Sequence, residues 1–404
     1  MAETEAITLP TERPTPFDPP TGLAELRETR PVARLAYPDG HRGWLVTSHA
    51  LVREVLADRR FSARPELRHL PTRPGGPSGQ PAPPGMFVAT DPPVHTRYRH
   101  LLTGEFTVRR MRRLTERIGE VTHAYLDAME RQGPPADLVE AFAAPIPAVV
   151  ICELLGVPEE DRERFMAQGA TLMRADLPQE EKVPAFLAMR GHMEELVLAR
   201  RARPGDDLLS GLTGSDLTDE ELAGIGFVLL GAGLDTTANM LALGTFALLL
   251  HPDQLEVLRA GPGGVELVVE ELLRYLSIVP FLVRTALEDV ELGGELVRAG
   301  ETVTVSIAAA NRDPERFPRP DRLDARRAGG GHVAFGHGVH QCLGRQLARV
   351  EMLAAYPALF GRLPSLRLAV APGEVPLRTD MLIHGVHRLP VTWPVTWPIT
   401  REAP

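Results

Sequence analysis

The sequence predicts a mainly α-helical (α+β) protein that forms one unit over residues 1–404. Residues 217–250 and 345–360 have apolar residues at helical spacing, which indicates two long helices. A short strand is expected near Trp44–Thr47, where apolar residues follow a turn. Because 404 residues are 44% hydrophobic, the chain can bury a large core.

The composition also restricts the class of protein. A net charge of −9 argues against general nucleic-acid binding. The two cysteines, Cys152 and Cys342, lie far apart, which argues against zinc and disulfides and favours a reducing compartment. Residues 1–20 are acidic and proline-rich, so we expect a flexible tail with no signal region and no membrane anchor. Residues 394–404 continue a Pro-Val-Thr-Trp duplication and are expected to fray. We expect the protein to be a cytoplasmic monomer.

Residues 63–93 form a Pro/Gly-rich stretch that is too long for an ordinary connection. Long segments of this kind are usually functional or disordered. Farther along the chain, Thr218 and Glu221 predict a capping box, and Pro252 is expected to end the long helix.

Residues 225–250 of that helix are almost wholly apolar, so a membrane span is an alternative interpretation. Asp235 in its middle would cost ~3 kcal/mol in a bilayer and no basic flank anchors the segment, which favours the central helix of a large core. Burying a polar side chain costs free energy unless it is hydrogen-bonded, so the presence of Asp235 and Thr236 inside such a helix needs an explanation. One reason is that Thr236 bonds the carbonyl of the preceding turn and kinks the helix.

Cys342 follows a glycine-rich loop and precedes the helix expected from Arg345. A helix N-terminus favours a thiolate, and Gly336, Gly338 and Gly344 would let a flat ligand approach the sulfur. The alternative is that Cys342 is a small buried apolar residue. A thiolate axial ligand to haem iron favours O–O cleavage, which is the functional interpretation.

The pattern Phe335, Gly338, Cys342 and Gly344 closely resembles the haem-binding signature of the cytochrome P-450 monooxygenases. The resemblance extends from the strand near Trp44 to residues 385–390, and residues 273–277, 338–342 and 385–393 look most like the enzymes of streptomycetes. It implies the cytochrome P-450 fold, a helix-rich core around haem with a smaller β-rich region.

The resemblance also implies a set of cofactor and catalytic residues. Cys342 would be the iron ligand of haem b, Asp235 and Thr236 would deliver protons, and Gly233 would leave room for oxygen. His95, Arg99, Arg284 and His340 match the propionate-binding positions, which need cationic or N–H donors. The whole implied set of cofactor contacts is His95, Arg99, Ala232, Gly233, Arg284, Phe335, Gly336, His340, Cys342 and Gly344.

Glu271 and Arg274 share a helix face and could be a simple surface ion pair. Downstream, residues 320–323 resemble the family's Pro-x-Arg-Phe segment, with Leu323 in place of Phe. The resemblance therefore implies a buried structural triad of Glu271, Arg274 and Arg322.

Three apolar segments match the family's substrate-contacting regions, although each could equally be ordinary core. They lie in the long loop, after the Glu271 helix and near the C-terminus, and a further contact is expected from the long helix. The residues are Met86, Phe87, Val88, Leu229, Phe281, Leu282, Val283, Met381 and Leu382.

These features together indicate a monooxygenase that inserts one atom of O2 into an apolar small molecule. We expect hydroxylation of a macrolide, a polyketide or another secondary metabolite. Epoxidation, successive oxidations and oxidative coupling remain alternatives on the same scaffold. Some relatives only stabilise a partner enzyme, but these typically lack the cysteine ligand, so Cys342 argues against that role.

The sequence has no G-x-G-x-x-G segment after a strand, so electrons from NAD(P)H are expected to come through another protein, a ferredoxin with its reductase. A basic cluster is the candidate docking site, unless it is simply a solvated helix face. The cluster consists of Arg109, Arg110, Arg112 and Arg113.

Overall fold

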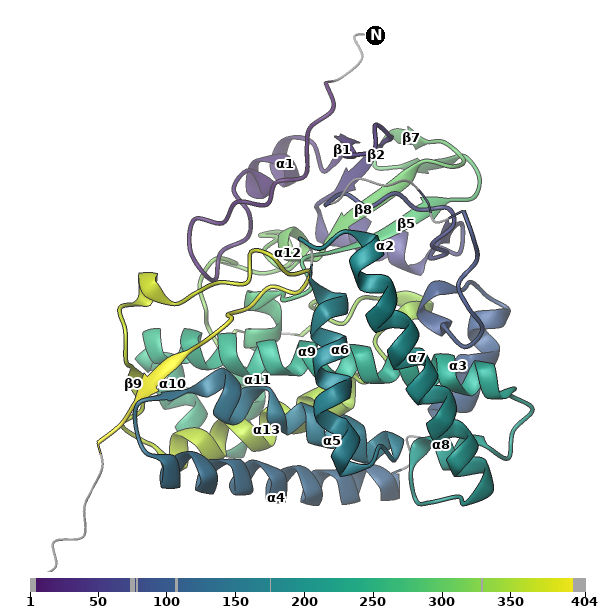
Figure 1. The fold of residues 1–404 in the computed structure, drawn as a ribbon. Helices are drawn as coiled ribbons and strands as arrows, with labels where there is room; N and C mark the ends of the chain where they lie inside the picture. Colours follow the sequence, from purple (N-terminus) through teal and green to yellow (C-terminus); the bar gives the residue numbers. More distant parts are fainter. Residues whose placement is uncertain are drawn as a thin grey trace, which may run out of the picture.

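The computed structural model describes residues 5–394 except 73–76, 78, 106, 107, 175, 328 and 329. Most of its elements are helices, and a small sheet lies at one end of the molecule (Figure 1). The predicted helix-rich α+β fold is therefore confirmed. The helices are α1 Leu23–Thr29, α2 His49–Ala57, α3 Val94–Glu105, α4 Val108–Gln132, α5 Pro145–Leu155, α6 Arg162–Met173, α7 Gln179–Ala202, α8 Leu208–Leu212, α9 Asp219–Leu250, α10 Pro252–Arg259, α11 Pro262–Leu276, α12 Ile307–Ala310 and α13 Arg345–Arg362.

The strands form one larger sheet and two small ones. The larger sheet has the order β1-β2-β8-β5-β3, and the small sheets are β4-β10-β9 and β6-β7. In the larger sheet β2 runs parallel to β8, with Trp44 beside Val303, and the other pairs are antiparallel. The bounds are β1 Val32–Ala36, β2 Arg42–Val46, β3 Phe61–Ser62, β4 Ala136–Asp137, β5 Phe281–Ala286, β6 Val290–Leu292, β7 Glu295–Val297, β8 Thr302–Ser306, β9 Arg367–Leu368 and β10 Pro390–Thr392.

Helix α9 crosses the middle of the molecule among the other helices (Figure 1). Its predicted capping box is confirmed, because Thr218 Oγ1 accepts from the Glu221 N–H at 3.2 Å and Glu221 Oε2 accepts from the Thr218 N–H at 2.9 Å. The helix is long and apolar enough to cross a membrane, but 61% of its most apolar window is buried inside the protein. A helix that is apolar on all sides is expected in such a core position.

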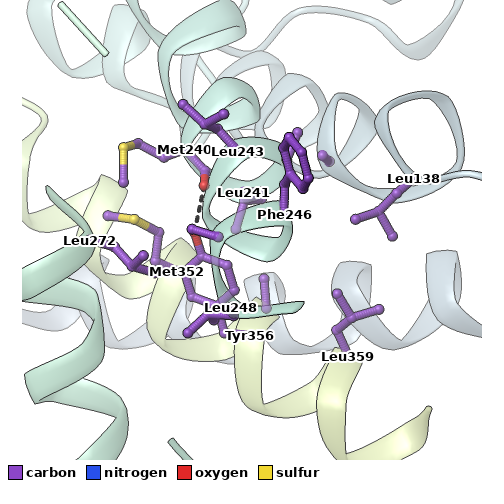
Figure 2. Packing of buried hydrophobic residues seen from close by; sticks show 14 of the residues in the cluster. Leu138, Met240, Leu241, Leu243, Phe246, Leu248, Leu272, Met352, Tyr356 and Leu359 are labelled. Atoms are coloured by element: carbon purple, nitrogen blue, oxygen red, sulfur yellow. Dashed lines mark hydrogen bonds between the residues drawn. The ribbon is translucent and has the colours of Figure 1, made fainter. Parts of the chain in front are cut away.

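Helix α13 packs directly on α9, and a buried tyrosine fixes the contact. The Tyr356 hydroxyl donates to the Met240 carbonyl oxygen at 2.5 Å, within the apolar cluster drawn in Figure 2. A Cβ on Gly244 would lie 2.0 Å from that hydroxyl oxygen, so only glycine allows this approach. The helix that carries the cysteine loop is thereby held in a defined position against α9.

The N-terminal segment differs from the expected flexible tail. Ile7 forms a bridge with Leu35, and the Phe17 ring is 6% exposed, with its centroid 5.0 Å from that of Phe246. Arg312 Nη2 also donates to the Phe17 carbonyl oxygen at 3.0 Å. An apolar ring and a buried guanidinium therefore hold residues 5–20 against the body of the protein. Of the C-terminal extension expected to fray, residues 395–404 lie outside the described residues.

The long loop that was expected over residues 63–93 is anchored at its ends where the structure describes it. The Asp91 carboxylate accepts from Ser62 Oγ at 2.5 Å and from the Ala63 N–H at 2.9 Å. Gly85 lies against α9, because a Cβ there would be 2.0 Å from the Glu221 carbonyl oxygen. The loop thus passes over α9 close to the candidate site.

Candidate active site

A cavity of about 280 Å³ lies between α9 and the loop that precedes α13. Its lining is mostly apolar and includes residues that were predicted from the sequence as cofactor and substrate contacts. The cofactor positions that line it, together with Thr236, are His95, Arg99, Ala232, Gly233, Phe335, Gly336, His340, Cys342 and Gly344. The substrate positions that line it are Phe87, Val88, Leu229 and Leu282.

The cysteine loop is held open by glycines and backbone hydrogen bonds. The Cys342 N–H donates to the Phe335 carbonyl oxygen at 2.9 Å, and the side chain of Cys342 faces the cavity. Gly338 has φ +73°, and a Cβ there would lie 2.2 Å from the Leu56 carbonyl oxygen, so this position requires glycine. A Cβ on Gly344 would meet nothing within 4 Å, so this position is not crowded.

The electrostatics of Cys342 differ from the sequence expectation. Burial among surrounding atoms raises the pKa of the thiol, although the hydrogen bond from the Gly344 backbone and the charges of Arg99, Arg345 and Arg349 act to lower it. We expected the start of α13 to favour a thiolate, but desolvation outweighs that effect in the protein alone. A metal cation bound to the sulfur would act in the opposite direction and lower the pKa of the thiol.

A group of basic side chains lies at one edge of the cavity. The His95 and His340 rings are 4.2 Å apart between centroids. Burial, followed by the charge of Arg99, lowers the pKa of His95 to about 4, and burial, followed by the charge of Arg284, lowers that of His340 to about 3. His95 Nδ1 is buried without a hydrogen-bond partner among the described residues.

Arg284 lies behind these rings and does not line the cavity. It is 7% exposed, its Nη1 donates to the Val283 carbonyl oxygen at 2.8 Å, and burial lowers its pKa to about 10. A buried cation is unfavourable without a matching anion. The basic group therefore suits carboxylates such as the propionates of haem, with the Cys342 sulfur available to its iron. The residues present fit that cofactor.

The middle of α9 is arranged differently from a simple proton-delivery pair. The Thr236 hydroxyl lines the cavity and donates to the Ala232 carbonyl oxygen at 2.8 Å, as the helix-kink interpretation requires. Asp235 does not line the cavity, because its Oδ1 accepts from Arg378 Nη1 at 2.7 Å. Asn239 Nδ2 also donates to this Oδ1 at 3.1 Å, while Oδ2 is buried without a partner among the described residues.

Gly233 has a packing reason that the sequence did not indicate. A Cβ on Gly233 would lie 2.7 Å from Ile151 Cγ1, so glycine at this position permits α5 to pack against α9. The residue also lines the cavity, where room for oxygen had been expected.

Glu351 on α13 is a further lining residue that sequence reasoning missed. It is 3% exposed, and burial raises its pKa to about 8 although the neighbouring Thr237 hydroxyl of α9 acts to lower it. A signal was present, because Glu351 stands beside Met352 on the apolar side of a helical run. Two polar side chains from α9 and α13 thus meet inside the cavity wall.

The structural triad needs one correction. Arg274 is paired with Glu271 through two hydrogen bonds of 2.8 Å, as expected, but the side chain of Arg322 is exposed and contributes only its carbonyl oxygen, 3.2 Å from Arg274 Nη2. Arg327 supplies the second guanidinium instead, with Nε 3.4 Å from Glu271 Oε1. The chain turns back after residue 323, and this turn brings Arg327 to the buried carboxylate.

The remaining predicted substrate positions do not line this cavity. Phe281, Met381 and Leu382 line a second cavity of about 620 Å³. Met86 packs against the apolar core near α9, and Val283 is buried in β5. Neither Met86 nor Val283 lines the two cavities.

The predicted basic cluster lies at the start of α4. Arg113 is paired with the Asp206 carboxylate, and Arg110 Nη2 donates to the Asp207 carbonyl oxygen at 3.4 Å, whereas Arg112 is exposed. The side chain of Arg109 lies outside the described residues. Part of the cluster therefore holds α4 to the segment before α8.

Comparisons with known proteins agree with this geometry. The family model for cytochrome P450 matches residues 265–382. Cytochrome P450 105C1 of a Streptomyces species is 50% identical over 396 residues, which cover 97% of this chain and 100% of that protein. Pentalenic acid synthase of Streptomyces avermitilis is 43% identical over 392 residues, which cover 96% of this chain and 97% of that protein.

A solved structure extends the similarity to three dimensions. The crystal structure of CYP105P1 in complex with filipin I superimposes with a TM-score of 0.93 at 43% sequence identity, over 97% of this chain and 100% of that one. The similarity therefore covers the helices, the sheet and the cysteine loop together.

Proposed function

The chain belongs to the cytochrome P450 family, and we propose that it hydroxylates an apolar secondary metabolite, a macrolide or another polyketide. As a member of this family it is a monooxygenase that uses haem b, O2 and electrons from NAD(P)H. Haem supplies the iron at which O2 is activated, and a thiolate ligand favours cleavage of the O–O bond. The following roles belong to residues of this chain.

The observation that carries the proposal is the position of Cys342, whose side chain faces an apolar cavity that Thr236 lines. Cys342 would ligate the iron, and His95, Arg99, Arg284 and His340 would hold the haem carboxylates. His95 supports this assignment because its Nδ1 is buried without a partner among the described residues. A haem carboxylate would give this ring nitrogen a hydrogen-bond partner.

Thr236 and Asp235 of α9 would deliver protons from the side of the cavity that faces the cysteine loop. The Thr236 hydroxyl can accept a hydrogen bond from substrate or water while it donates to Ala232. Asp235 would need to leave Arg378 to reach the cavity, so its contribution depends on breaking a pair of 2.7 Å. A positioned acid or base typically accelerates a proton-transfer step by about 10²–10⁴-fold.

The apolar lining supports an apolar substrate. Phe87, Val88, Leu229 and Leu282 offer hydrocarbon surface, and Thr236 offers a hydroxyl. Two relatives are named for secondary metabolites, pentalenic acid synthase and nocardicin C N-oxygenase, and CYP105P1 binds filipin I in its solved structure. We extend that class of substrate to this chain. We also propose that the protein is located in the cytoplasm.

The decisive test is the spectrum of the reduced, carbon-monoxide-bound protein. The wild type should show the strongly red-shifted Soret band of thiolate ligation, and Cys342→Ala should lose it. Cys152→Ala is the matched control, because Cys152 is fully buried in α5 and far from the cysteine loop in sequence, and it should keep the band. Retention of the band in Cys342→Ala would overturn the ligand assignment. A spectral titration against macrolides and polyketides, followed by product analysis, then tests the substrate class.

Electrons would arrive from a ferredoxin with its reductase. Arg112 is exposed at the start of α4, and Arg99 lies close enough to Cys342 for its charge to act on the thiol. We propose that an acidic ferredoxin docks over the face that carries Arg109 and Arg112. Charge reversal of Arg112 together with Arg109 should slow reduction and flatten its dependence on salt. The same reversal at Arg367, an exposed arginine in β9, should have no such effect, and equal behaviour of the two variants would count against this docking site.

A further inference from the structure

The second cavity, of about 620 Å³, is separate from the first. Residues 278–282 stand between the two. Val279 and Leu282 line the first cavity, whereas Pro280 and Phe281 line the second. The same short segment therefore forms one wall of both spaces.

The opposite wall of the second cavity comes from the N-terminal segment. Leu9, Pro10, Thr11, Glu12 and Arg13 line it, opposite the 377–384 loop. The two walls are tied together, because His384 Nε2 donates to the Pro16 carbonyl oxygen at 2.8 Å (Figure 1 shows the purple N-terminal segment beside the yellow C-terminal one). The N-terminal segment, which was expected from the sequence to be a flexible tail, is thus an ordered wall of this cavity.

The two arginines that line this cavity differ in whether a carboxylate is paired with them. Arg378 is 9% exposed and is paired with Asp235 at 2.7 Å. Arg13 differs, because its Nη1 donates at 2.7 Å to the backbone carbonyl oxygen of Asp18, a neutral acceptor. Burial, followed by the charge of Arg312, lowers the pKa of Arg13 to about 10.

The other ionisable residues of the lining do not balance Arg13 directly. Burial lowers the pKa of His384 to about 4, so this side chain is neutral at pH 7. Glu12 is exposed to solvent. The charge of Asp18 does favour the protonated form of Arg13, but this carboxylate also lies 3.7 Å from Arg312 and accepts from Thr15 Oγ1. Arg13 therefore retains donors for an anion that enters the cavity.

The rest of the lining is largely apolar. Leu9, Phe281, Leu377, Met381 and Leu382 surround the space near the polar groups. We propose that this cavity is a second binding site, for an amphipathic carboxylate whose carboxyl group binds Arg13 and whose hydrocarbon part packs on these residues. The site is distinct from the haem cavity and does not depend on the hydroxylation proposed above.

Calorimetric titration of the holoenzyme with decanoate tests the proposal, with decanol as the neutral probe of the same length. The haem cavity is first filled with 4-phenylimidazole, whose bond to iron is read from the Soret band. Decanoate should bind and leave that band unchanged. Displacement of the imidazole, or no binding of decanoate, would overturn the proposal.

Variants identify the residue. Arg13→Gln should weaken decanoate binding about tenfold and leave decanol binding unchanged, because a charge-assisted hydrogen bond is lost. Arg13→Lys should retain most of the affinity. Arg30→Gln, a change at an exposed arginine of the same part of the chain, should have no effect on either probe. If Arg13→Gln binds decanoate as the wild type does, or loses both probes equally, the carboxylate site at Arg13 is wrong. Because these readouts are heats of binding, they stand whether or not the enzyme hydroxylates its proposed substrate.

Discussion

Thr237 of α9 lies close enough to Glu351 of α13, in the lining of the haem cavity, for its hydroxyl to lower the pKa of that carboxyl group. The two residues belong to the central helix and to the helix that follows the cysteine loop. Burial raises the pKa of Glu351 to about 8, so this carboxyl group is mostly protonated at pH 7 and costs less to bury than a carboxylate would. The burial of Glu351 therefore makes the stability of the protein depend on pH.

The pH dependence can be predicted with its sign. The folded protein keeps a proton on Glu351 up to pH of about 8, whereas the unfolded chain releases it near 4.5. The stabilisation is therefore complete below about pH 4.5 and is lost as the pH rises through about 8. Between pH 6 and pH 8 the wild type should lose about 2 kcal/mol that Glu351→Gln keeps, as measured by urea unfolding. Glu266→Gln, at an exposed position, should show the wild-type slope. Identical slopes for wild type and Glu351→Gln would contradict the assignment.

Thr236→Ala should retain haem and substrate but lose coupling. The variant lacks the hydroxyl that lines the cavity, so electrons should be diverted to hydrogen peroxide. Product formed per NAD(P)H consumed measures this loss, and Thr236→Ser should restore it. Asp235→Asn should slow turnover more than it uncouples it. If the hydroxyl serves only the bond to Ala232, Thr236→Ala will change stability and leave coupling intact.

The corrected triad predicts unequal effects for two arginines. Arg327→Ala should destabilise the protein by about 2–4 kcal/mol, because it removes a partner of the buried Glu271 carboxylate. Arg322→Ala should change stability by less than about 0.5 kcal/mol, since its side chain is exposed and its carbonyl remains. Chemical denaturation of both variants measures the difference. A larger effect at Arg322 would restore the arrangement that the sequence suggested.

Tyr356→Phe should cost about 1–2 kcal/mol of unfolding free energy. The change leaves the Met240 carbonyl without the hydrogen bond that it accepts in the core. Tyr125→Phe, at a partly buried position against the same cluster, is the matched control and should cost less than about 0.5 kcal/mol. Equal thermal unfolding of the two variants would show that the bond contributes little.

The sequence predicted those parts of the structure that short-range patterns determine. The capping box of α9, its apolar length and the glycine loop before α13 depend on residues within a few positions of one another. Thr236 also bonds within its own helix, to Ala232, as one interpretation stated. Local spacing contains the information for these contacts.

Contacts between distant segments could not be read in the same way. Arg378 reaches Asp235 across 143 positions, and nothing beside either residue indicates the other. Arg327 replaced Arg322 because the path of the loop, and not the motif, decides which guanidinium reaches Glu271. The N-terminal segment was expected to be flexible on composition, yet one aromatic residue, Phe17, and one distant guanidinium hold it.

The parallel pairing of β2 with β8 has a consequence for synthesis of the chain. Residues 42–46 leave the ribosome long before residues 302–306. The β2 edge of the β1-β2 hairpin therefore stays without its β8 partner until most of the chain has been synthesised. During that interval the edge presents unpaired backbone groups to any neighbouring nascent chain. Slow translation should therefore prolong exposure of this hairpin, and co-translational chaperones that shield strand edges should raise the yield of folded enzyme.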